Sequence, residues 1–97
     1  MTDPVPGIID FSTAEVDEEV SGIPADRVVT GAPVQSVRNV FADPTGQFFV
    51  GTWSATPGSW RIRYTEHEFC HLLAGSVRLT DPRGRVWSFG AGASFIV

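Results

Sequence analysis

Hydrophobic and polar positions alternate over short stretches through the second two-thirds of the chain. A period of two residues is typical of strands with one face buried and one face in water. The stretches are separated by residues that favour turns, mainly Gly, Pro, Asp and Ser. The pattern predicts seven short strands, at residues 34–42, 47–55, 60–66, 68–74, 76–81, 85–89 and 93–97.

The third and fourth of these stretches differ in how apolar residues are distributed over their two faces. Along residues 60–66 the alternation predicts one inward set, consisting of Trp60, Ile62, Tyr64 and Glu66. Along residues 68–74 both faces are partly apolar. That composition is typical of a strand covered on both sides, by two layers or by a layer and a second subunit.

Two segments of the form Asp-Pro-x-Gly punctuate the pattern, at residues 43–46 and 81–84. Asp caps such a turn with its side chain, Pro presets φ at the second position, and Gly tolerates the conformation that closes it. Each segment is therefore predicted to join two antiparallel strands. Many short strands with such turns indicate an all-β fold, an antiparallel sandwich or barrel of the jelly-roll type.

Residues 1–33 lack this regularity and are expected to form an irregular acidic leader before a β-domain at residues 34–97. Ser12, with Glu15 three residues later, has the pattern of a capping box and predicts a short helix at residues 12–20. Residues 1–26 contain no basic residue, whereas every arginine lies in residues 27–97. The leader is either a solvated terminus or an arm that docks on the arginine-bearing body of its own or a partner chain.

The composition narrows the class of protein. A chain of 97 residues, 42% of them hydrophobic, is expected to form one small globular domain. No apolar run reaches the roughly 20 residues of a membrane-spanning helix, and no basic cluster interleaved with aromatic residues points to nucleic acid. A single cysteine cannot form an internal disulfide. We therefore expect a cytoplasmic protein without a membrane or nucleic-acid partner.

Residues 64–75 contain both histidines, the only cysteine and two glutamates, so site chemistry is expected there. Glu68 on an inward face needs a partner, a proton or a ligand, because an unpaired buried carboxylate is costly. Cys70 is either a buried structural thiol or, beside His71, a nucleophile. A bulge that turned an imidazole inward would allow a metal site made of Glu66, His67 and His71.

Through motifs between Trp53 and Gly92, roughly residues 30–97 resemble the small single-domain cupins grouped with the cupin domain of (S)-ureidoglycine aminohydrolase. Glu68 and Gly75, with six residues between them, match the end of the first cupin motif, G-x5-H-x-H-x3,4-E-x6-G. Gly92 and the five residues after it match the opening of the second motif, G-x5-P-x-G-x2-H-x3-N. The resemblance implies an RmlC-like jelly roll, a small molecule bound in the barrel, and a continuation beyond Val97 that would supply the missing C-terminal strands.

The resemblance also implies where metal ligands would lie. The H-x-H positions of metal-binding cupins fall on Ile62 and Tyr64, or on Arg61 and Arg63 with the longer spacer. Isoleucine has no donor atom, and a phenol is a weak substitute for imidazole. Of the ligands that resemble those of the aminohydrolase, Glu68 alone could serve. We therefore expect no bound metal.

Two main functions remain open at the level of sequence. The first is a cupin that binds a small polar metabolite, with Glu68 as acceptor or general base and with Tyr64, Cys70, Trp53 and Trp60 as further contacts. The tryptophans could instead fill the core. The alternative is an enzyme resembling (S)-ureidoglycine aminohydrolase, which would use one manganese, zinc or iron ion. An interaction module without chemistry is a third option, and an open sheet edge favours a homodimer.

Overall fold

The computed structural model describes residues 7–97, and within that range it contains nine β-strands and no helix. Every paired strand is antiparallel. The chain divides into two compact units, with the division between Ile62 and Arg63. The all-β, antiparallel fold expected from the sequence is confirmed.

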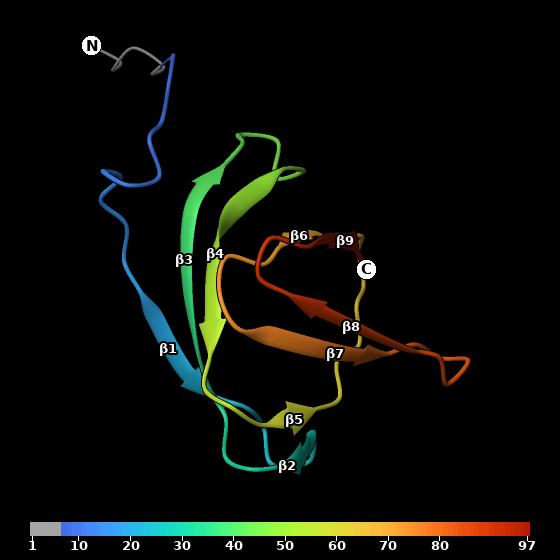
Figure 1. Cartoon of the computed structure of the whole chain (residues 1–97). Coiled ribbons are helices and arrows are strands. Elements are labelled where there is room, and N and C mark those ends of the chain that lie inside the picture. The colour runs from blue at the N-terminus through green and yellow to red at the C-terminus, as the bar shows by residue number, and fades with distance from the viewer. Residues whose placement is uncertain (1–6) are drawn as a thin grey trace. The chain divides into compact units, whose positions relative to one another are not determined.

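The first unit contains two sheets (Figure 1). Strand β3 (Val34–Ala42) lies between β1 (Glu19–Gly22) and β4 (Phe49–Ala55) in a three-stranded sheet. The short strand β2 (Val28–Thr30) pairs with β5 (Ser59–Trp60). Two of the five strands thus come from the segment that the sequence presents as a leader.

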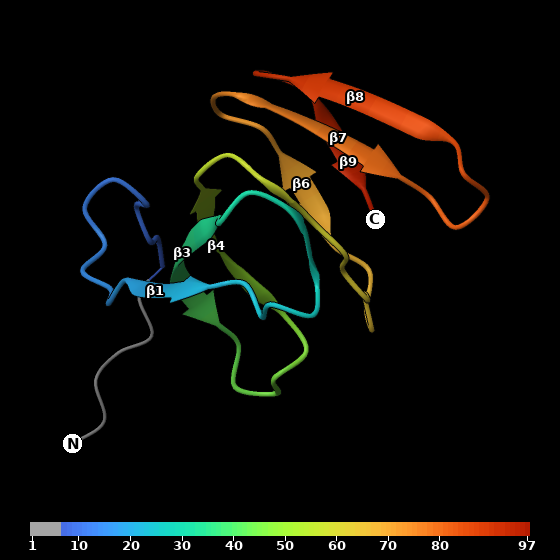
Figure 2. The ribbon, with the colours of Figure 1, turned by 90° about the horizontal axis from the view of Figure 1, so that it is seen from below.

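The second unit consists of two ribbons, which Figure 2 shows. Strand β6 (Phe69–His71) pairs with β9 (Ser94–Ile96), and β7 (Ser76–Thr80) pairs with β8 (Val86–Gly90). The rings of Phe89 and Phe95 stack with centroids 4.3 Å apart and an interplanar angle of 11°. This contact joins the two ribbons through their half-buried faces.

Both Asp-Pro-x-Gly segments form the predicted turns. In the turn between β3 and β4, the N–H of Gly46 donates to the carbonyl of Asp43 at 3.0 Å. In the turn between β7 and β8, the N–H of Gly84 donates to the carbonyl of Asp81 at 2.9 Å. The two glycines have φ of 72° and 81°, in the region that favours glycine.

Aspartate holds each turn by its side chain as well as by its backbone. Asp81 Oδ1 accepts the N–H groups of Arg83 and Arg85, at 2.9 Å and 3.0 Å. In the other turn, Asp43 Oδ1 accepts the N–H groups of Gln47 and Phe48. Hydrogen bonds to the charged form hold the pKa of both carboxyl groups below the ordinary value, although desolvation opposes them.

Most strand predictions are confirmed to within a few residues, but residues 60–66 do not form a strand. Ladder pairing there ends soon after Trp60, where the N–H of Arg61 donates to the carbonyl of Arg27 at 2.9 Å. The partner strand β2 has three residues, so it offers no further pairing. Inward and outward faces predicted from alternation across Ile62, Tyr64 and Glu66 therefore do not apply.

The predicted helix at residues 12–20 is also wrong. Asp10 provides the cap: its Oδ1 accepts the N–H and the hydroxyl of Ser12, at 2.9 Å and 2.7 Å. A single turn closes where the N–H of Ala14 donates to the carbonyl of Asp10 at 2.9 Å. The chain then extends and pairs β1 with the edge of β3, so the backbone hydrogen bonds are made to the sheet.

Apolar side chains in residues 7–97 are half-buried or exposed, and Pro33 is the one buried residue of that range. Phe69 and Ile96, which are cross-strand partners, are each 70% exposed. Exposed apolar side chains in this number are typical of surfaces that contact a ligand or another protein. Within residues 7–97, no helix has the length and hydropathy needed to cross a membrane.

Candidate functional site

Glu68 and Cys70 lie together on one face of the β6–β9 ribbon. Backbone pairing continues beyond β6, because the N–H and the carbonyl of Glu68 bond to Val97 at 3.1 Å and 3.0 Å. Residues two apart in an extended segment project to the same side. Accordingly, the thiol of Cys70 donates a hydrogen bond to Oε1 of Glu68 at 3.5 Å. Glu68 is exposed and Cys70 is half-buried, so the inward face that the sequence predicts for Glu68 is wrong.

The surroundings keep the Cys70 thiol protonated. Burial, the negative charge of Glu68 and the hydrogen bond to it raise the pKa of Cys70 to about 11. All three causes disfavour the thiolate, which is the form that acts as a nucleophile or binds a metal. At neutral pH, Cys70 is therefore a hydrogen-bond donor. The interpretation of Cys70 beside His71 as a nucleophile pair finds no support in this environment.

Tyr64 belongs to the same cluster through its electrostatics. Burial raises the pKa of its phenol, and the charges of Glu68 and Cys70 raise it further. A phenol whose anion is disfavoured is a neutral donor and acceptor at physiological pH. Tyr64, Glu68 and Cys70 together form what we call the polar cluster, with two neutral O–H or S–H groups beside one carboxylate.

The two histidines do not join the polar cluster. His71 follows Cys70 directly in β6, so its side chain projects to the opposite side of the ribbon. Its Nδ1 lies 2.7 Å from the hydroxyl oxygen of Ser94, the residue paired with it on β9. His67 Nδ1 lies 3.3 Å from the carbonyl oxygen of Val97. Each imidazole thus has a local partner of its own.

Cupin folds often hold a divalent ion, and the donors of residues 7–97 do not fit one. Within residues 7–97, no three His, Cys, Asp or Glu side chains converge as metal ligands, so Glu66, His67 and His71 are not assembled. The first-motif position at Ile62 carries no donor atom. The carboxylate of Glu68 is already hydrogen-bonded to a protonated thiol.

Trp53 and Trp60, the other predicted ligand contacts, lie in the first unit. Their ring centroids are 6.1 Å apart, with an interplanar angle of 53°. Trp53 is 53% exposed and Trp60 is half-buried, so Trp53 does not fill a core. The indole N–H of Trp53 donates to Oε1 of Gln35 at 3.1 Å. Gln35 played no part in the sequence prediction, because nothing in its local sequence marks a contact across two strands.

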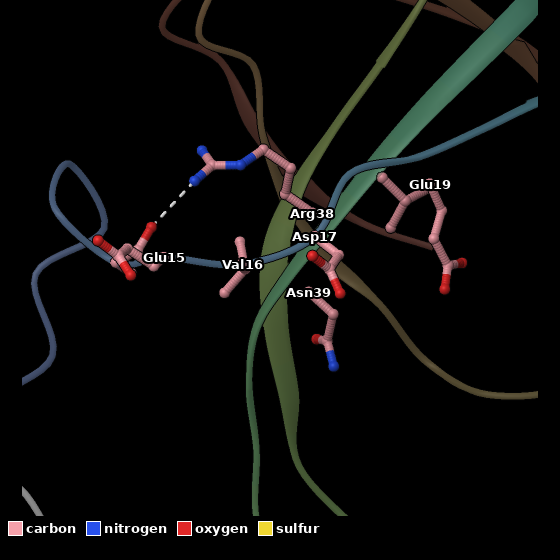
Figure 3. A pocket seen from close by; sticks show the side chains of 8 residues that line it. Glu15, Val16, Asp17, Glu19, Arg38 and Asn39 are labelled. Atoms are coloured by element: carbon pink, nitrogen blue, oxygen red, sulfur yellow. Dashed lines mark hydrogen bonds between the residues drawn. The ribbon is translucent and has the colours of Figure 1, made fainter.

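A hollow in the surface lies beside the acidic segment that precedes β1 (Figure 3). A guanidinium nitrogen of Arg38 on β3 donates to the carbonyl of Ala14 at 3.2 Å. Ser36 on β3 donates to the carboxylate of Glu18, the residue that precedes β1. The acidic segment is therefore docked on its own chain rather than solvated throughout. The hollow is lined by Ala14, Glu15, Val16, Asp17, Glu19, Val37, Arg38 and Asn39.

The antiparallel strands, the Asp-Pro-x-Gly turns and the carboxylate on the strand of the first cupin motif define an all-β protein of the cupin class. A family model described as the EutQ-like cupin domain matches residues 42–97. Because this match covers more than half of the chain, the chain belongs to the EutQ-like cupin family. No curated protein and no solved structure matches it. The cupin assignment made from the motifs is thus confirmed, while the closer resemblance to the ureidoglycine aminohydrolase group stays a hypothesis.

Proposed function

We propose that this chain binds a small, polar metabolite at the polar cluster, without the help of a metal ion. The observation that carries this proposal is the hydrogen bond from the thiol of Cys70 to the carboxylate of Glu68, and the charge of that carboxylate acts on the phenol of Tyr64. Two neutral donors next to one carboxylate acceptor complement a ligand that has a carbonyl oxygen and N–H or O–H groups. Small amides, ureides and hydroxy acids have this pattern.

Glu68 is the residue with the largest role in this proposal. Its carboxylate takes the N–H or O–H groups of the ligand, since hydrogen bonds to an ionised acceptor are stronger than neutral ones. The same carboxylate is the group positioned to act as a general base on a bound ligand. The aminohydrolase-like alternative would need a metal donor set, and the residues of this site favour binding without one.

The test is a ligand screen by saturation-transfer NMR with a mixture of small amides, ureides and hydroxy acids. A ligand of the polar cluster should bind the unmodified chain and lose about tenfold or more in affinity to Glu68→Gln. That substitution removes the charge and keeps the shape of the side chain.

Glu66→Gln is the matched control, because Glu66 is also exposed but makes no hydrogen bond with Cys70 in this structure. It should bind the same ligand with unchanged affinity. Equal losses in both variants would show that net charge, and not the polar cluster, governs binding. Binding that is indifferent to Glu68→Gln would contradict the proposed site.

A further inference from the structure

Trp53 presents an aromatic face to solvent at a fixed orientation. Its indole N–H is held by Gln35, and Nε2 of Gln35 in turn donates to Ser21 Oγ at 3.4 Å. These three side chains come from β4, β3 and β1, so the contacts run across the whole three-stranded sheet. The register pairs Trp53 with Val37, which makes Gln35 its diagonal neighbour on the same face. The ring is thus oriented before any ligand arrives.

The second tryptophan makes the surface angular. Trp60 stands at 53° to Trp53 with its centroid 6.1 Å away, so the two rings form a wedge and not a parallel slot. The hydroxyls of Thr30 and Ser59 are 2.8 Å apart, but Ser59 directly precedes Trp60 in β5, so they project to the other side of that strand pair. Within residues 7–97, neither indole has a cation–π contact or a hydrogen bond to a charged side chain. Two inclined rings cannot both stack on a flat ligand, and the amide and hydroxyl groups of Gln35 and Ser21 carry no charge to pair with a charged one.

From this geometry we propose a second binding site, a saccharide platform made of Trp53, Trp60 and Gln35. A pyranose ring has a face of axial C–H bonds whose partial positive charge complements the negative face of an indole. Its hydroxyls lie around the rim, where Gln35 and Ser21 offer amide and hydroxyl groups. A planar base would need parallel rings, and an anion would need a cationic partner. A β-glucoside, whose substituents are all equatorial, presents the most complete C–H face.

The platform shares no residue with the polar cluster, and all of its residues belong to the first unit. It is open and shallow, so a single sugar residue should bind weakly and an oligosaccharide more tightly. Failure of ligand binding at Glu68 would leave this proposal intact, and the reverse also holds.

The experiment is a titration of the ¹⁵N-labelled chain with methyl β-D-glucopyranoside and with cellotriose, followed by the indole N–H signals. The expected result is a shift of the Trp53 indole signal and of the Ser21 and Gln35 amide signals, with tighter binding of cellotriose. Trp53→Ala should lower the affinity for cellotriose by about tenfold or more. Trp53→Phe, which keeps a smaller aromatic face, should lower it less.

Trp87→Ala is the matched control. Trp87 is 49% exposed, close to the 53% of Trp53, but it lies in the second unit with its indole N–H near Asp81. Its loss should leave cellotriose binding unchanged. Sorbitol, an acyclic polyol without a rigid C–H face, and adenosine, a planar ligand, should not shift the Trp53 signal. Absence of a cellotriose-dependent shift, equal losses in the two alanine variants, or preferential binding of adenosine would overturn the proposal.

Discussion

Replacement of Gly51 by alanine is expected to destabilise the first unit by about 3 kcal/mol. Gly51 on β4 faces Asn39 on β3, next to the register shift between Asn39 and Phe41. A Cβ at this position would collide with the carbonyl oxygen of Arg38 and would lie 2.9 Å from the Cα of Asn39. Both obstacles are backbone atoms, so relief requires movement of the strand pair.

Chemical denaturation followed by circular dichroism measures this effect. Gly90→Ala is the control, because Gly90 also lies in a strand but an added Cβ there meets nothing within 4 Å. That variant should be neutral or slightly stabilising, since alanine costs less conformational entropy than glycine. A Gly51→Ala variant as stable as the unmodified chain would mean that β3 and β4 do not pair in this register.

Removal of the charge of Glu68 is expected to make Cys70 about tenfold more reactive toward iodoacetamide near pH 8. The pKa of Cys70 is raised to about 11 by burial, by the charge of Glu68 and by the hydrogen bond to it. Glu68→Gln abolishes the charge and weakens the hydrogen bond, so the pKa falls and the thiolate fraction at a given pH rises. Burial still keeps the pKa of the variant above the ordinary thiol value.

Alkylation rates measured by mass spectrometry across a range of alkaline pH give the pKa directly. The profile of the unmodified chain should rise steeply only above about pH 10, whereas that of Glu68→Gln should rise at lower pH. Urea-unfolded protein provides the reference, because there the thiol regains the ordinary cysteine pKa of about 8.5. Identical profiles for the folded chain and the variant would show that Glu68 does not face Cys70.

The sequence predicted the strands best where two signals agreed. The stretch 34–42 coincides with β3, because alternation there ends in an Asp-Pro-x-Gly turn whose geometry is set by local residues. The prediction of a helix at residues 12–20 was wrong because the chain pairs β1 with the edge of β3. That edge is distant in sequence, so the local capping pattern carries no information about it. Pairing across the sheet decides such segments, and local propensity does not encode it.

The candidate site was predictable only in part. Contacts between residues close in sequence could be predicted, and contacts that depend on strand pairing could not. Glu68 and Cys70 are two residues apart in a strand, so their common face follows from the period of an extended chain. The position of Tyr64 does not follow from this period, because residues 61–66 form no strand and Tyr64 lies in a loop. The pairing of Gln35 with Trp53 depends on the register of two strands, which the sequence pattern left unspecified. The homodimer and the cytoplasmic location stay predictions.

No three metal donors converge within residues 7–97, and the proposed function is therefore ligand binding without a metal ion. In a cupin whose site includes a divalent ion, the ion supplies the charge that orients the ligand. In the proposed site, the groups that would orient the ligand are the protonated Tyr64 and Cys70 and the carboxylate of Glu68. The ligand should therefore be held by hydrogen bonds alone.

The most direct test is the affinity of the ligand found in the screen, measured by titration calorimetry after EDTA treatment and again with added manganese. The polar cluster predicts one ligand per chain and the same affinity under both conditions. Binding that appears only with manganese, and that His67→Ala and His71→Ala each abolish, would contradict a metal-independent site.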